Sequence, residues 1–253
     1  MNLLDILFPV KCPVCGHLLK KGERGFCQDC TKNLPRVTEP ACCRCGKPIE
    51  KDTQEYCRDC GRKRQAVRMK GDRSGADGAG KDPICQGTAL WIYTVSMKRA
   101  MANFKYNGCY SEGAFYAEEL ARTRRSRFEQ WQPDYVIPVP LHRRRRWFRG
   151  YNQAACVAEE LGLRIEVPVA SMALERIRCT RPQKGLDDRH RRNNVKDAFR
   201  IAGDWRKRLQ GRCVLLVDDI YTTGATLEAC ASVLREAGVR KVYFACLCTG
   251  RDY

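Results

Sequence analysis

Residues 214–230 read VLLVDDIYTTGATLEAC: four apolar residues run into two adjacent acids, Asp218 and Asp219, and then into hydroxyls and a glycine. The apolar run predicts a buried strand, and the spacing after Thr226 predicts a helix. Two like charges at the end of a buried strand need a partner. Phosphate would be repelled, so the pair suits ribose hydroxyls or a Mg²⁺ ion.

The segment that follows the acids suits a phosphate. Its residues are Thr222, Thr223, Gly224, Ala225 and Thr226. Gly224 permits a tight turn, the threonines add hydroxyls, and the next helix contributes the partial positive charge of its N-terminus. Acids and loop together predict a site for a ribose 5-phosphate. The GxxxxGK[ST] and GxGxxG motifs of other nucleotide sites do not occur in the sequence.

The rest of the C-terminal part alternates between strand and helix patterns from residue 87 onward. Strands are expected at 88–95, 134–141, 212–217 and 241–248, and helices at 96–106, 110–131, 152–162 and 226–238. In the third helix Asn152 is the expected N-cap and Gly162 the expected end. This alternation predicts an α/β fold with a parallel sheet, in which ligands bind beyond the carboxyl ends of the strands.

Nine of the 17 cysteines lie within residues 12–60, and eight of these form two CxxC pairs that recur 30 residues later. The two sets are Cys12, Cys15, Cys27 and Cys30, then Cys42, Cys45, Cys57 and Cys60. Four thiolates with this spacing predict tetrahedral Zn²⁺, and complete sulfur ligation predicts a structural role. Because each repeat is complete in itself, sequential pairing is favoured over a cross-braced arrangement. Cys43 falls outside the frame.

Composition sets further limits. Lys and Arg number 47 against 29 Asp and Glu, a net charge of +18 that favours polyanionic partners. No apolar run approaches the roughly 20 residues that span a bilayer, and the short apolar start reads as packed chain, so we expect a cytoplasmic protein without a membrane span. Residues 64–86 are charged and rich in glycine, which predicts a linker between a ribbon domain, 1–63, and a second domain, 87–253.

The acidic pair followed by TTGAT resembles the PRPP motif of type I phosphoribosyltransferases. Three further stretches match, FKYNG at 104–108, IPVPLHRRRRWFRGYNQA at 137–154 and QKGLDDRHRRNNVKDAF at 183–199. With them the chain resembles, over nearly its whole length, the ComF family of competence-associated proteins. The resemblance implies a small double zinc ribbon, in which four cysteines hold each of two structural Zn²⁺ ions. A type I phosphoribosyltransferase-like domain that binds PRPP with Mg²⁺ is expected to follow it.

The resemblance also implies roles for residues. Asp218 and Asp219 hold the ribose hydroxyls and Thr222–Thr226 the 5-phosphate. The segment 142–150, expected as a loop after the central strand, binds pyrophosphate through Arg143, Arg144, Arg145, Arg146 and Arg149, or faces nucleic acid. A mobile hood spans 180–199, with Gln183, Leu186, Arg191, Asn194 and Phe199 matching the family.

Four residues within these stretches call for separate expectations. Asp197 stands where a glycine is common in the family. Trp147 and Phe148 are expected in the core rather than stacked on a base. Lys105 matches the family but has no assigned role.

Two functions remain open at this point. One is a glycosyltransferase-class enzyme that transfers phosphoribose from PRPP to an unidentified acceptor, a reaction needing positioning and charge stabilisation but no side-chain nucleophile. The other is a non-catalytic component of the transformation machinery that binds single-stranded DNA and keeps a regulatory or vestigial PRPP site. The charge of +18 and the arginine runs at 122–127 and 143–149 favour the second. Competence or DNA-processing proteins docking on the ribbons are a third, simpler interpretation.

Overall fold

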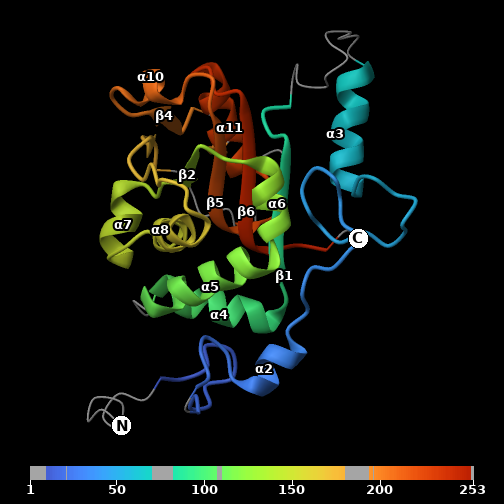
Figure 1. Ribbon diagram of the computed structural model, residues 1–253, viewed down its shortest axis with the longest axis vertical. Helices are drawn as coiled ribbons and strands as arrows, with labels where there is room; N and C mark the ends of the chain where they lie inside the picture. Colours follow the sequence, from blue (N-terminus) through green and yellow to red (C-terminus); the bar gives the residue numbers. More distant parts are fainter. Residues whose placement is uncertain are drawn as a thin grey trace.

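The computed structural model describes residues 10–20, 22–69, 82–106, 110–179, 194–195 and 197–251. An α/β unit occupies its centre, the first ribbon lies beneath helices α4 (Val95–Tyr106) and α5 (Tyr110–Thr123), and the second lies beside strand β1 (Gln86–Ile92) (Figure 1). The expected combination of a small Cys-rich N-terminal part and an α/β part is confirmed.

The α/β unit is built on a four-stranded parallel sheet with the order β1-β6-β5-β2. The other strands are β2 (Tyr135–Pro138), β5 (Cys213–Tyr221) and β6 (Lys241–Thr249). β5 and β6 are central and strongly apolar, as expected for strands buried on both faces. β2 is the last of these four strands, and residues 168–170 pair in parallel with its outer side, where the Val136 N–H donates to the Pro168 carbonyl at 3.0 Å. The arginine segment therefore follows a strand that has a hydrogen-bonded neighbour on each side.

Alternate residues of the central strands feed two separate cores. Val214, Leu216 and Phe244 pack with helix α11 (Ala225–Glu236) and with the second ribbon. Leu215 and Val217 face the other way and pack with α4, α5 and helix α8 (Gln153–Ile165), together with Phe26 of the first ribbon. Each ribbon therefore contributes to a different face of the sheet.

A small antiparallel sheet joins the two ends of the chain segment expected to form the hood. It pairs β3 (Leu174–Arg176) with β4 (Phe199–Ile201), and Phe199 is buried beneath the Arg176 guanidinium, 5.2 Å from its ring centre. Asp197 has a φ of 54°, the left-handed conformation that explains why glycine suits this position. Gln183, Leu186 and Arg191 lie outside the described residues.

Several element boundaries differ from expectation. The pattern at 110–131 forms two helices, α5 and α6 (Arg125–Trp131), and the Arg124 guanidinium at the break donates to the carbonyl of Ala89 at 2.8 Å. Asn152 does cap α8, accepting from the Ala154 N–H at 3.2 Å, but the helix continues past Gly162 to Ile165. Gly162 serves packing instead, because a Cβ there would lie 2.4 Å from Val169 Cγ2.

The ribbons repeat each other in structure as in sequence. Short antiparallel bridges join Lys11 to Leu18 and Ala41 to Pro48, and each repeat ends in a helix, α2 (Gln28–Asn33) or α3 (Arg58–Met69). α3 extends past residue 63, into the expected linker, and 70–81 lie outside the described residues. The domain boundaries therefore stay a prediction.

Candidate functional site

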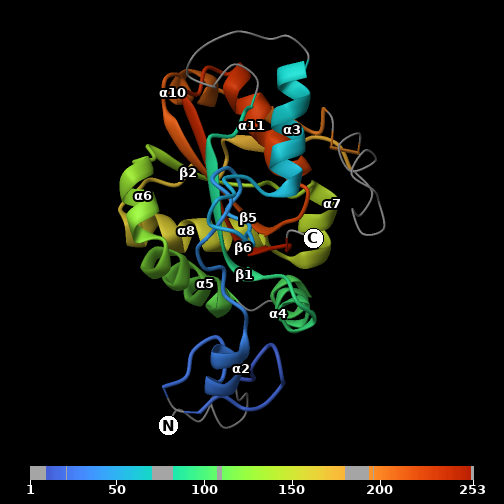
Figure 2. The same ribbon diagram turned by 90° about the vertical axis from the view of Figure 1, so that its right-hand side faces the viewer.

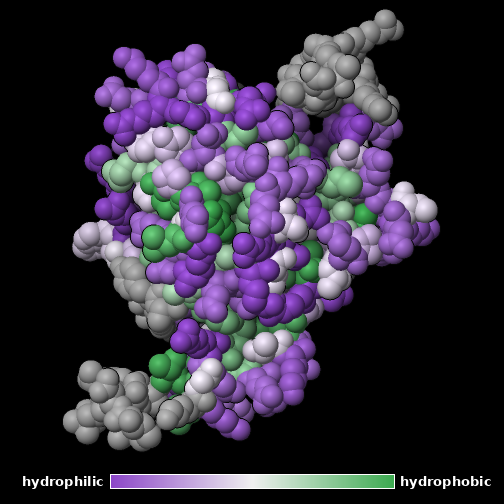
Figure 3. Space-filling view, viewed as in Figure 1, coloured by the Kyte–Doolittle hydropathy of each residue, from purple (hydrophilic) through white to green (hydrophobic). Residues whose placement is uncertain are grey.

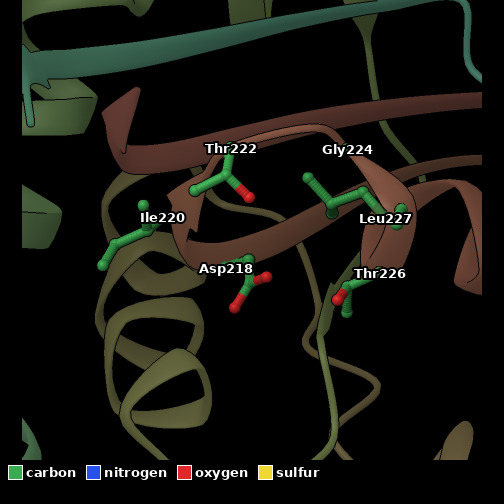
Figure 4. A pocket seen from close by; sticks show the side chains of 7 residues that line it. Asp218, Ile220, Thr222, Gly224, Thr226 and Leu227 are labelled. Atoms are coloured by element: carbon green, nitrogen blue, oxygen red, sulfur yellow. The ribbon is translucent and has the colours of Figure 1, made fainter. Parts of the chain in front are cut away.

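The acids and the expected phosphate loop meet at the carboxyl end of β5. One pocket is lined by Asp218, Ile220, Thr222, Gly224, Ala225, Thr226 and Leu227 (Figure 4). The strand is longer than its apolar run predicts and carries both acids to its end, so that the loop can turn directly into α11. Asp218 and most of the loop thus share one cavity, as the sequence predicts.

The two acids have different surroundings. Burial and the charge of Asp219 raise the pKa of Asp218 to about 7. Asp218 also accepts a hydrogen bond from the Asp219 N–H, at 2.9 Å. Asp219 itself forms an ion pair with Lys105 of α4. Burial alone would lower the pKa of Lys105. The charge of Asp219 and its hydrogen bond together have the larger effect, so the pKa of Lys105 is raised.

Lys105 lies beside the acidic pair, a position that the sequence did not reveal. The FKYNG match marks it, but only the fold brings α4 to the end of β5. Tyr151 holds the last turn of α4, donating to the carbonyl of Phe104, and Gln153 donates to the carbonyl of Lys105 at 3.3 Å. Lys105 is therefore placed by backbone contacts to face the acidic pair.

Gly224 sets the geometry of the loop. Its φ is +81°, and a Cβ there would lie 2.7 Å from the Tyr221 hydroxyl, so only glycine fits. Its carbonyl accepts the N–H of Glu228 at 2.8 Å and starts α11, whose 12 residues direct a partial positive charge at the loop. The Thr223 hydroxyl is buried and has no hydrogen-bond partner among the described residues.

The arginine segment is helical rather than a loop. Helix α7 (Arg143–Arg149) is capped by His142, whose Nδ1 accepts the Arg144 N–H at 3.3 Å. Arg143, Arg144 and Arg146 are exposed. Arg149 donates to Gln153 at 3.1 Å, and its charge acts on Lys105 beside the acids.

The aromatic residues of α7 contradict their expected burial. Trp147 is 80% exposed and Phe148 is 79% exposed, with ring centres 5.2 Å apart. The reason is that α7, a seven-residue helix after β2, buries none of its side chains. The helix presents aromatic rings and guanidinium groups on one small exposed element.

The cysteines group as the repeat predicts. Within each set, Cys12, Cys15, Cys27 and Cys30 or Cys42, Cys45, Cys57 and Cys60, the four sulfurs lie within 4.8 Å of one another, which confirms sequential pairing. The Cys15 and Cys27 sulfurs are 3.7 Å apart and those of Cys45 and Cys57 3.6 Å apart. A tetrahedron with zinc–sulfur bonds of about 2.3 Å has edges of about 3.8 Å, so both sets fit structural zinc. Cys43 is exposed and belongs to neither set.

The exposed surface is mainly polar. The face in Figure 3 is largely hydrophilic, with smaller hydrophobic areas between. Among the described residues no helix combines the length and the apolar character needed to cross a membrane.

Two family models match the chain in the order that the fold suggests. The double zinc ribbon domain matches residues 3–61 and the phosphoribosyl transferase domain residues 164–253. The chain is therefore a double zinc ribbon followed by an α/β domain of the phosphoribosyltransferase type.

Three named proteins are similar to parts of this chain. Competence protein F of Haemophilus influenzae is 39% identical over 44% of this chain and 48% of its own length. DNA utilization protein YhgH of Escherichia coli O157:H7 is 40% identical over 46% of this chain and 49% of its own. Competence protein ComFC of Bacillus subtilis is 28% identical over 60% and 59%. The chain spans about half the length of the first two relatives.

The chain is similar to these competence and DNA utilization proteins. Solved structures resemble it more weakly. The match to an allosteric regulatory enzyme of purine biosynthesis covers 54% of this chain and 25% of that chain at 20% identity, with a TM-score of 0.36.

Proposed function

We propose that this protein binds PRPP with Mg²⁺ in the pocket at the end of β5 and transfers its phosphoribosyl group to an acceptor. The single observation that supports this most is that Asp218 lines one cavity together with four residues of the loop, Thr222, Gly224, Ala225 and Thr226. Acids that accept hydroxyl donors and a loop that donates to phosphate complement the two ends of the sugar phosphate. The cysteines of both sets are free thiols and not disulfides, which suits the reducing cytoplasm that we propose as the location of the protein.

The proposed chemistry depends on position and charge. Asp218 and Asp219 accept the ribose hydroxyls, and the loop with the N-terminus of α11 holds the 5-phosphate. Lys105 and Arg176 are the cations that act on the acids, and Arg149 and Arg145 of α7 act in turn on these two. Arg145 and Arg149 would stabilise the departing pyrophosphate. Carboxylate oxygens fit Mg²⁺, which would neutralise pyrophosphate charge when bound.

A calorimetric titration with PRPP and Mg²⁺ tests the proposal. The variant Asp218→Asn/Asp219→Asn should lose affinity about 100-fold, roughly 3 kcal/mol, because charge-assisted hydrogen bonds to the sugar disappear. Asp52→Asn, the same change at an exposed ribbon residue, is the matched control and should bind as the wild type does. No heat with the wild-type protein would overturn the proposal.

A second function, binding of single-stranded DNA, is favoured by α7. Trp147 and Phe148 are exposed beside Arg143, Arg144 and Arg146, and successive bases stack on such aromatic side chains while guanidinium groups bind phosphates. The relative named DNA utilization protein agrees with this direction. Both proposals use α7, through Arg145 and Arg149 for PRPP and through the exposed residues of the same helix for DNA, so the two ligands would meet at this element.

Fluorescence anisotropy with a labelled oligonucleotide tests this second function. Trp147→Ala should weaken binding by about 1–3 kcal/mol through lost stacking. Replacing Arg143 and Arg144 by Gln should flatten the salt dependence by about 0.7 for each lost phosphate contact. Leu163→Ala removes an equally exposed apolar side chain, 76% accessible, from α8 and should change nothing. Absent or salt-independent binding would contradict this function.

A further inference from the structure

The second ribbon contacts the loop that we propose as the phosphate site. Lys63 of α3 donates to the backbone carbonyl of Thr223 at 3.1 Å. The same ammonium pairs with Glu228 Oε1 at 2.5 Å, and Arg44 reaches that oxygen at 3.0 Å. Figure 2 shows α3 alongside α11. Residues separated by 160 positions in sequence thus meet at the start of α11.

The contacts with Glu228 change the electrostatic environment of the pocket. It lies in the first turn of α11, next to the pocket-lining residues Thr226 and Leu227. An uncompensated carboxylate there would repel a bound phosphate and offset the attraction of the helix N-terminus. Both cations of the ribbon pair with this one carboxylate, whose side chain is 19% exposed. Their charge therefore makes the pocket more favourable for an anion.

The contact with Thr223 acts on the loop backbone directly. The carbonyl that Lys63 binds belongs to the same peptide unit as the N–H of Gly224, a residue that lines the pocket. A cation on the carbonyl fixes the orientation of that unit and polarises its N–H, which strengthens it as a donor. The loop is thereby held in one conformation before a ligand arrives, which reduces the ordering cost of binding.

The ribbon can hold the loop because its own cations are fixed. Arg44 is 8% exposed, pairs with Asp82, and donates to the sulfur of Cys60 at 3.8 Å. Lys47 lies 5.8 Å from the ring centre of Tyr221, the residue whose hydroxyl borders Gly224. The second cysteine set, α3 and the phosphate loop therefore form one packed unit.

We propose that the second ribbon forms part of the phosphate site, with Lys63 and Arg44 as positioning residues that act through the Thr223 carbonyl and Glu228. The ligand named in this inference rests on the proposed function, whereas the contact between Lys63 and the loop does not depend on it. It gives the ribbon a role in ligand affinity beyond bracing the chain.

The test compares Lys63→Met with Arg62→Met in the zinc-loaded full-length protein. Arg62 is the next residue of α3, is 75% exposed and pairs only with Asp59 among the contacts we observe, so both variants lose one positive charge from one helix. Calorimetry with PRPP and Mg²⁺ should show a roughly tenfold or greater loss of affinity for Lys63→Met. Arg62→Met should bind as the wild type does, and Lys63→Arg should recover part of the loss.

Hydrogen exchange of the ligand-free protein separates this inference from the proposed function. Amides of Gly224 to Thr226 should exchange faster in Lys63→Met and at the wild-type rate in Arg62→Met. Two zinc ions per chain in every variant would show that the ribbons are intact. Equal exchange and equal affinity in the two variants would overturn the inference. If the wild type gives no heat with PRPP, the proposed function fails, and the exchange rates alone decide the role of Lys63.

Discussion

Asp218 and Asp219 are adjacent in sequence but perform different electrostatic roles. Asp219 forms an ion pair with Lys105. Asp218 lines the pocket, and burial and the charge of Asp219 raise its pKa to about 7. Ionising Asp218 in the empty pocket costs free energy, and ligand hydroxyls or a metal ion would recover it. A carboxyl group whose pKa is shifted by burial and by a neighbouring like charge is a common property of binding sites.

This arrangement predicts a pH-dependent effect of Asp218→Asn. A raised pKa means that the stability contributed by this carboxyl is complete below about pH 4 and lost as pH rises through about 7. The variant avoids that loss, so its advantage in unfolding free energy over the ligand-free wild type should widen by roughly 2 kcal/mol between pH 5 and pH 8. Thermal unfolding at both pH values measures it, with Asp52→Asn as control. A constant difference would refute the explanation.

The sequence predicts best the helices and strands whose apolar residues follow a regular pattern because one or both faces are buried. The apolar runs of β5 and β6 and the helical spacing of α8 and α11 leave little choice of fold. The end of α8 was predicted wrongly because Gly162 is required by the approach of Val169 and not by a helix terminus. A contact between separate segments decides this, and local pattern does not contain it.

The sequence of α7 contains features that favour a helix, although a loop was predicted there. Arginine favours helices, and His142 is able to cap one, yet family resemblance suggested a loop. Trp147 and Phe148 are exposed because α7 packs none of its side chains into a core, which the sequence pattern does not reveal. For the site, Asp218 and its loop were predictable because they are contiguous. Lys105, Lys63 and Arg44 were not, because their partners lie far away in the chain.

At the scale of the whole molecule, the two ribbons are alike in sequence but not in environment. The second set, Cys42, Cys45, Cys57 and Cys60, is fully buried and joins the core that contains α11. In the first set Cys15 is exposed and Cys30 half-buried. A chelator reaches a zinc site through exposed ligands or through local opening, and opening the second site would disturb a core face of the α/β domain.

We therefore expect zinc to leave in two phases when the protein is mixed with excess chelator. The first ribbon should release its ion quickly and with little change in the thermal midpoint, and the second should release it slowly and with loss of the cooperative transition. Cys15→Ser should remove the fast phase, Cys45→Ser the slow one, and Cys43→Ser, at an exposed cysteine outside both sets, neither. A colorimetric zinc indicator follows both phases. Release of both ions at one rate would mean that the ribbons are equally accessible, contrary to the burial of the second set.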